Sequence, residues 1–200
     1  MEIEDIFNDR ITARQIEIDQ IIREFWIVIE PFSGKLYTIN DDGSIDVDGS
    51  VKFPKVCNFI TQLPLTFNKV SGNFDCSKLS LTTLKGSPKE VGGYFDCSYN
   101  NLASLEFSPK TVKGSFVFDN MVSSLFTGEI SCNFIDVVMR IRTNTPGVGI
   151  PEKILQYSSY LSTIFKYQNY YDVWDVWDDL NSINEENFDG LIEDIKDGLE

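Results

Sequence analysis

The sequence predicts an α+β protein in three parts. These are an N-terminal helix and β-hairpin at residues 1–46, a short solenoid of three to four coils at 47–127, and a helical cap at 128–200. Apolar residues at helical spacing near both ends predict the helices, and an internal repeat in the middle predicts the solenoid. With 200 residues, 42% of them hydrophobic and 15 of them Phe, the chain is able to bury a substantial core.

The N-terminal part begins with an amphipathic helix. Its apolar stripe follows the spacing i, i+3, i+4, i+7 and consists of Ile18, Ile21, Ile22 and Phe25. The apolar run at 26–29, a turn at 31–34 and an alternating run at 35–39 then predict a β-hairpin. Asp41-Asp42-Gly43 predicts a second turn.

The middle part is a tandem repeat with a period of 21 residues. Gly72-Asn73-Phe74-Asp75-Cys76-Ser77 aligns with Gly93-Tyr94-Phe95-Asp96-Cys97-Ser98, and the same offset aligns Leu81 with Leu102. The period extends over about residues 51–126. A period of this length, with one short strand per repeat, is typical of a solenoid in which neighbouring coils together bury an apolar row.

The repeat also fits a leucine-rich-repeat template. Phe95-x-Cys97-x-x-Asn100-x-Leu102-x-x-Leu105 matches LxLxxNxLxxL, with Phe and Cys in two leucine positions. Because Cys is a small residue that is often buried, we expect Cys76 and Cys97 to be stacked, unbridged core residues. Asn100 is expected to hydrogen-bond backbone groups in the turn that follows the strand.

Residues 84–102 closely resemble the repeat of leucine-rich-repeat-like proteins encoded by large tailed bacteriophages, approximately SLEGxPKEVGGxFxCSxNxLT. The resemblance covers about residues 35–126. It implies a bacteriophage origin and a solenoid used for binding, and it brings no catalytic residues. The resulting expectation is a leucine-rich-repeat-like solenoid flanked by the N-terminal helix and hairpin and the C-terminal helical cap.

The C-terminal part is predicted to be helical from about Gly128. Ile135, Val138 and Met139 have helical spacing, and Pro151 is expected at the first position of a helix. A further helix is predicted from Val173, Val176, Trp177 and Leu180. Asn184 is predicted to cap the last helix, whose apolar stripe consists of Phe188, Leu191, Ile192, Ile195 and Leu199.

Composition excludes several classes of function. Lys and Arg total 17 against 31 Asp and Glu, a net charge of −14, which argues against direct binding of nucleic acid or of an anionic membrane. The absence of His removes imidazole catalysis and His-containing metal sites. The Asp-rich turns at 42–43 and 46–49 lack the spacing of a calcium loop. We therefore expect a protein that is not an enzyme and has no cofactor or metal.

The absence of CxxC pairs, of a long apolar run and of a secretory leader predicts reduced thiols in a cytosol. Charge is uneven: residues 168–200 hold 11 acidic residues and one basic residue. This segment is interpreted either as the solvated face of capping helices or as an acidic surface that imitates DNA phosphates.

The leading hypothesis is an accessory protein that binds and inhibits a host protein, such as a defence component, in the cytoplasm of the infected cell. The alternatives are an acidic decoy for a nucleic-acid-binding site of a host protein, or a structural component of the virion. The partner and the oligomeric state stay open. Side chains beside the inward positions of each strand are expected to point to the concave sheet face and contact the partner. They are Asn73, Asp75, Ser77, Tyr94, Asp96, Ser98, Ser115, Val117 and Asp119.

Overall fold

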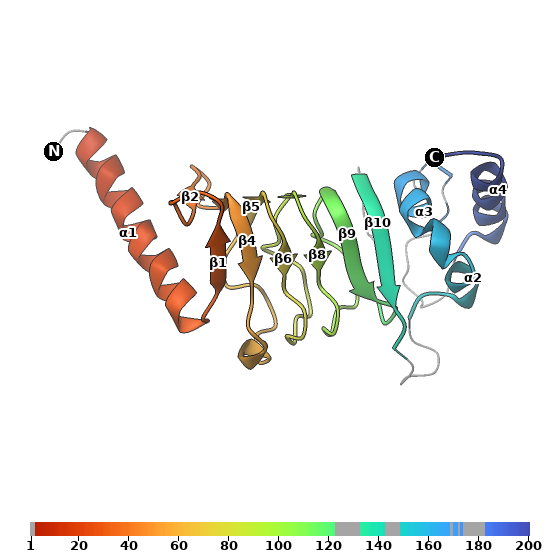
Figure 1. Cartoon of the computed structure of the whole chain (residues 1–200), viewed down its shortest axis with the longest axis horizontal. Coiled ribbons are helices and arrows are strands. Elements are labelled where there is room, and N and C mark those ends of the chain that lie inside the picture. The colour runs from red at the N-terminus through yellow and green to blue at the C-terminus, as the bar shows by residue number, and fades with distance from the viewer. Residues whose placement is uncertain (1–2, 123–132, 143–148, 169, 172, 174–182) are drawn as a thin grey trace.

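The computed structural model describes residues 3–122, 133–142, 149–168, 170–171, 173 and 183–200. It is a β-solenoid of about four turns with helices at both ends, so the predicted α+β class is confirmed. Helix α1 (Ile3–Glu24) lies at the N-terminal end of the stack of coils, and α2, α3 and α4 lie at the C-terminal end (Figure 1).

Each coil contributes two short strands, so the expectation of one strand per repeat is wrong. On one face, β4 (Gly49–Lys52), β6 (Phe74–Asp75) and β8 (Phe95–Asp96) pair in parallel. On the other face, β3 (Ile45–Val47), β5 (Phe67–Val70) and β7 (Glu90–Val91) do the same. The long strand β9 (Thr111–Asp119) pairs with both β7 and β8 and joins the two faces.

Glycines at the bend between the two faces let successive coils stack backbone on backbone. A Cβ atom at Gly92 would lie 2.1 Å from the carbonyl oxygen of Ser71, and one at Gly72 would lie 2.6 Å from that of Gly49. Contacts this short exclude any side chain at these positions. The Gly residues of the repeat therefore set the close spacing of the coils at this corner.

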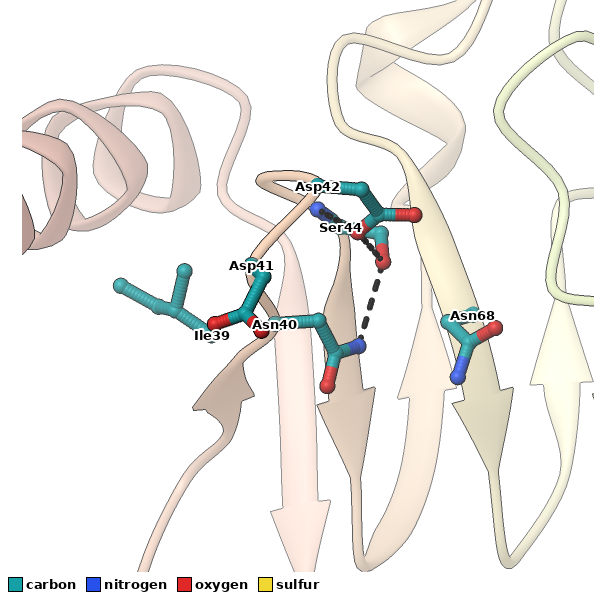
Figure 2. A pocket seen from close by; sticks show the side chains of 6 residues that line it. All are labelled: Ile39, Asn40, Asp41, Asp42, Ser44 and Asn68. Atoms are coloured by element: carbon teal, nitrogen blue, oxygen red, sulfur yellow. Dashed lines mark hydrogen bonds between the residues drawn. The ribbon is translucent and has the colours of Figure 1, made fainter.

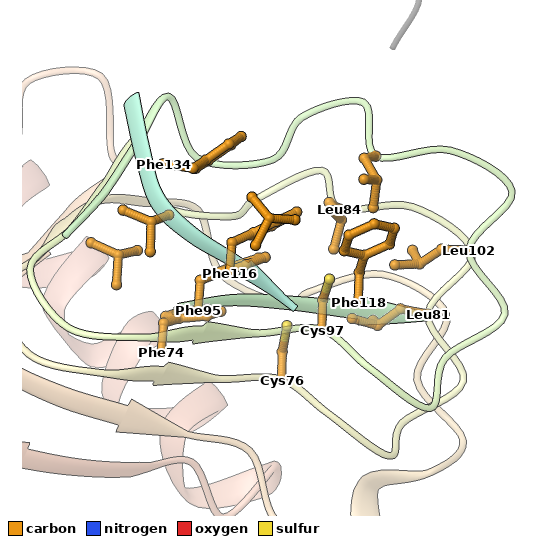
Figure 3. Packing of buried hydrophobic residues seen from close by; sticks show 14 of the residues in the cluster. Phe74, Cys76, Leu81, Leu84, Phe95, Cys97, Leu102, Phe116, Phe118 and Phe134 are labelled. Atoms are coloured by element: carbon orange, nitrogen blue, oxygen red, sulfur yellow. The ribbon is translucent and has the colours of Figure 1, made fainter. Parts of the chain in front are cut away.

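The interior is built on a ladder of phenylalanine rings (Figure 3). The ring centroids of Phe74 and Phe95 are 5.7 Å apart, those of Phe95 and Phe116 are 5.4 Å apart, and those of Phe116 and Phe134 are 4.8 Å apart. Phe165 continues the ladder into the C-terminal helices, with its ring 6.3 Å from that of Phe134. A continuous series of aromatic contacts, stacked within the coils and edge-on at Phe165, thus connects the coils to their C-terminal cap.

Cys76, Cys97 and Asn100 occupy the positions that the repeat predicts for them. Both cysteines are buried with free thiols, which confirms the expectation that they are stacked core residues. The Asn100 amide donates to the carbonyl oxygens of Cys76 at 2.9 Å and Cys97 at 2.8 Å, and its Oδ1 accepts from the backbone N–H of Leu81 at 3.1 Å. Its predicted role is confirmed.

The predicted N-terminal helix is present as α1, but the predicted hairpin is wrong. Strand β1 (Val28–Pro31) pairs antiparallel with β4, and β2 (Thr38–Ile39) pairs antiparallel with β3. The first coil has an open strand edge on each face, and each of the two segments satisfies the backbone groups of a different edge. The predicted turn at 41–43 is present, with Gly43 in the left-handed region.

The helix predicted around Ile135 is also wrong, because residues 133–140 form a strand. β10 (Asn133–Arg140) pairs in parallel with β9, and the register places Val137 beside Phe116, again 21 residues apart. Phe134 and Val137 are buried in the solenoid core. The structural repeat therefore continues one strand beyond the recognisable sequence repeat. Without β10, β9 would leave an apolar row and a backbone edge uncovered.

Three helices follow β10 in the described part of the chain: α2 (Glu152–Leu155), α3 (Leu161–Tyr167) and α4 (Glu185–Lys196). A 3₁₀ turn at Ser158–Tyr160 separates α2 from α3, and another at Lys55–Cys57 follows β4. Pro151 was predicted to be the first residue of a helix, but it is the N-cap of α2, which begins at Glu152. Asn184 caps α4 as predicted, its side chain accepting from the N–H of Asn187 at 3.1 Å. The helix predicted over 173–180 lies outside the described residues, except for the buried Val173.

Candidate protein-binding face

The outward side of β4, β6, β8, β9 and β10 is the candidate site, and we call it the binding face. In each of its central strands one side chain points into the phenylalanine ladder and its neighbours point outward. The strand register arranges the outward residues in two rows. One row consists of Lys52, Asp75, Asp96, Val117 and Val138, and the other of Ser50, Asn73, Tyr94, Ser115 and Asp136.

The nine predicted contact residues lie along this face and just beyond its strand ends, but they are unequally accessible. Tyr94 is 37% exposed, and five others are half-buried, namely Asn73, Asp75, Ser77, Asp96 and Ser115. Ser98, Val117 and Asp119 are 1%, 9% and 6% exposed. A binding role for the nine stays a prediction, and Tyr94 is the member with the most surface to offer a partner.

Two of the predicted carboxylates close turns of the solenoid. Asp75 Oδ1 accepts from the N–H and the hydroxyl of Ser77, at 3.1 and 2.7 Å. Asp96 does the same with Ser98, at 3.0 and 2.6 Å. The Asp-x-Ser unit is thus an Asx turn that ends β6 and β8. These residues shape the binding face before any partner reaches it.

Tyr94 stands among charged and polar side chains at the centre of the binding face. Burial and the neighbouring Asp75 carboxylate raise the pKa of its phenol, so the group is neutral at physiological pH. Lys52 Nζ lies 3.1 Å from Asp75 Oδ2, and the hydrogen bond to that carboxylate raises the pKa of Lys52. Asp75 therefore pairs with Lys52 while its other oxygen holds the turn.

Sequence reasoning missed the residues that β10 contributes to the binding face and that β1, paired with β4, contributes beside it. Val28 on β1 is 43% exposed and Val138 on β10 is 39% exposed. At the β10 margin, Ser115 Oγ on β9 donates to Asp136 on β10 at 2.8 Å. Helical spacing at 133–140 hid the β10 residues, whereas extending the 21-residue register beyond Phe116 would have found them.

Asp119, the last residue of β9, marks the edge of the binding face at the carboxyl ends of its strands. Its carboxylate accepts from the backbone N–H of Tyr99 and lies 3.5 Å from a guanidinium nitrogen of Arg142. Burial raises the pKa of Asp119 despite these partners. Such a buried group fixes the turn that bears Tyr99.

A second feature, an open pocket of about 430 Å³, lies at the N-terminal end (Figure 2). Its lining consists of Ile39, Asn40, Asp41, Asp42, Ser44 and Asn68. Asp42 accepts from the N–H of Ser44 at 2.9 Å, and the Asn40 amide donates to Ser44 Oγ and to Asp46 Oδ1, both at 3.1 Å. These polar groups satisfy one another, as in a tight turn. Across the described ranges no three Cys, Asp or Glu side chains are grouped so that they could hold a metal.

None of the helices that the structure describes is long and apolar enough to cross a membrane. Comparison with protein-family models, curated proteins and solved structures finds no match to this chain. The chain is a β-solenoid of about four turns with a repeat of about 21 residues.

Proposed function

We propose that this protein is a binding scaffold that recognises another protein through the binding face. The observation that carries the proposal is the contrast between the two sides of the same strands. Inward positions repeat Phe74, Phe95 and Phe116, whereas the outward positions beside them change from Asn73 to Tyr94 to Ser115. A uniform core that displays varied outward side chains, with a partly exposed Tyr among them, has the composition of a protein-binding surface.

The resemblance of the repeat to bacteriophage leucine-rich-repeat-like proteins supports a more specific proposal. The partner is a host protein, for example a defence component, which this chain binds in the cytoplasm of the infected cell and thereby inhibits. Binding of this kind requires no cofactor and no catalytic group. The proposed activity lies in the contact surface.

The test is affinity capture from host lysate with the wild-type chain and with Tyr94→Ala/Val138→Ala. Both replaced side chains are partly exposed, so circular dichroism and the melting temperature should stay unchanged. The matched control is Lys69→Ala/Glu90→Ala, which removes an exposed ion pair of 3.3 Å from the opposite face. We expect one captured protein to be lost with the first variant and retained with the second. Equal capture by all three proteins would contradict the proposal.

The acidic decoy remains a second candidate because of a specific feature of α4. Its first turn and outer side carry exposed carboxylates, Glu185, Glu186, Asp189 and Glu193. Lys153 pairs with Glu185 at 3.3 Å and with Asp189 at 2.7 Å, which leaves a net negative surface. A basic nucleic-acid-binding protein is the partner that this surface would suit.

A further inference from the structure

A cluster of cations surrounds one tyrosine next to the binding face. Lys78 Nζ lies 5.4 Å from the centroid of the Tyr99 ring, and the guanidinium carbon of Arg140 lies 5.5 Å from it. The Tyr99 side chain is 44% exposed. Arg142 joins them through a guanidinium that donates to the carbonyl oxygen of Asn100 at 3.0 Å. We call Lys78, Tyr99, Arg140 and Arg142 the Tyr99 cluster.

The repeat fixes the positions of these side chains. Lys78 and Tyr99 occupy the same turn of successive coils, and both have left-handed backbones, with φ of 61° and 57°. The backbone N–H of Tyr99 donates to Asp119, which pairs in register with Arg140 across β9 and β10. A left-handed backbone costs energy for a side chain larger than Gly, so the surrounding hydrogen bonds must hold the turn. The cluster is therefore arranged before a ligand binds.

The Tyr99 cluster is a cationic area on an acidic protein. Three lysines elsewhere are paired with carboxylates, namely Lys52 with Asp75, Lys69 with Glu90, and Lys153 with two carboxylates of α4, and within the cluster Arg142 is paired with Asp119. Within the part of the chain that the structure describes, no carboxylate forms an ion pair with Lys78 or Arg140. Both cations instead lie against the same aromatic ring, an arrangement that leaves their charge available to an anion.

We propose that the Tyr99 cluster binds an acidic segment of the protein partner. Carboxylates of the segment pair with Lys78 and Arg140, and its aliphatic carbons pack on the exposed part of the Tyr99 ring. The inference rests on the proposed protein-binding function and deepens it, because the cluster adjoins the binding face at Asp119 and Arg140. It assigns a charge to the part of the partner that meets this margin.

Basic and aromatic side chains together also suit single-stranded nucleic acid. That ligand needs a row of cations along several phosphates. Beyond the cluster the outward rows present Asp75, Asp96 and Asp136 instead, in a chain with a net charge of −14. A short acidic peptide that ends at the cluster avoids these carboxylates, so the observations favour the peptide.

The experiment is a titration of the full-length, ¹⁵N-labelled protein at low salt with three capped peptides and one oligonucleotide. The peptides carry paired Glu, paired Gln or paired Lys between glycines, and the oligonucleotide is a short oligothymidylate. We expect the Glu peptide alone to shift the amide signals of Lys78, Tyr99 and Arg140. In Lys78→Gln/Arg140→Gln its affinity should fall by about tenfold, since two exposed ion pairs are lost. The charge-matched control, Lys85→Gln/Lys110→Gln, should bind like the wild type.

Two outcomes would overturn the inference: equal shifts with the Gln peptide, or tighter binding of the oligonucleotide at the same residues. The cluster variant is also measured against the partner identified by capture. A partner that is lost with Tyr94→Ala/Val138→Ala but kept with Lys78→Gln/Arg140→Gln would leave the proposed function intact and refute the role of the cluster. Peptide binding at the cluster without any captured partner would refute the proposed function alone.

Discussion

Asn100 shows how a single side chain completes the backbone hydrogen bonding of two coils. It is 4% exposed and connects Cys76, Cys97 and Leu81 through its amide. In the preceding coil Leu79 stands at the equivalent position, so the polar contact is specific to one coil. A buried backbone group that loses its partner costs about 1–3 kcal/mol.

Replacing Asn100 by Ala should therefore lower the free energy of unfolding by about 2–4 kcal/mol, because several buried backbone groups lose their partner together. Urea denaturation followed by circular dichroism measures this. The control is Asn101→Ala at the exposed neighbouring position, where we expect a change of less than about 0.5 kcal/mol. Similar midpoints for both variants would show that water replaces the Asn100 contacts.

The buried cysteines lead to a second prediction at the residue scale. Burial raises the pKa of the Cys76 and Cys97 thiols well above their usual range, so the reactive thiolate is suppressed in the folded state. In a Cys132→Ser background, neither residue should react with a thiol reagent at pH 8 until denaturant is added. Cys97→Asp should abolish the cooperative transition, while Cys97→Ala should keep it at reduced stability. Rapid labelling of the native protein would place these thiols at the surface.

At the scale of elements, the period of the sequence located the coils correctly but could not identify every strand. Phe95 and Cys97 alternate with polar residues, which is a direct strand signal. Residues 133–140 contain Ile135, Val138 and Met139 at helical spacing, and only pairing with β9 makes them a strand. The hairpin prediction failed because the turn was placed between the wrong strands: β2 pairs with β3 across the turn at 41–43, and β1 pairs with β4, which comes later in the chain.

The candidate site was predictable to a similar extent. Alternation along β6, β8 and β9 placed nine residues on the outward side of the coils or at the strand ends, and their binding role stays a prediction. It could not show that Asp119 is buried, because the two groups that contact its carboxylate, the N–H of Tyr99 and the guanidinium of Arg142, are remote from it in sequence. The Tyr99 cluster was missed because Arg140 belongs to β10, which was predicted to be a helix.

The glycine bend supplies the prediction for this scale. Gly92→Ala should destabilise the protein by about 1–3 kcal/mol, because its Cβ would overlap the Ser71 carbonyl and separate two coils. Gly190→Ala, inside α4 with nothing within 4 Å of the added Cβ, should stabilise it by about 0.5–1 kcal/mol. Thermal unfolding of both variants measures the two effects. A melting temperature unchanged by Gly92→Ala would mean that the coils can move apart without cost.

For the molecule as a whole, the two proposed functions depend on two different surfaces, the binding face and the acidic C-terminal segment. The binding face lies on strands whose inward side chains form the phenylalanine ladder, and its exposed residues include Tyr94 and Val138. The acidic segment, residues 168–200, contains 11 acidic residues and one basic residue, a net charge of −10. The other 167 residues contain 20 acidic and 16 basic residues, a net charge of −4. A partner bound by the face depends on desolvated contacts, whereas one bound by the segment depends on long-range attraction.

Salt and charge variants therefore separate the two. Glu186→Gln/Glu193→Gln removes two exposed charges from α4. With the captured partner, we expect this variant and a rise in salt from low to physiological strength to change the dissociation constant by less than about threefold, since exposed charges are screened beyond about 8 Å at physiological ionic strength. Tyr94→Ala/Val138→Ala should weaken binding by about tenfold or more, because hot-spot side chains contribute 2 kcal/mol or more when truncated. DNA should not compete. The opposite result would be binding that is lost with the α4 variant, is displaced by DNA and survives the changes to the binding face. It would make the acidic surface the functional site, and the solenoid would then be the scaffold that supports it.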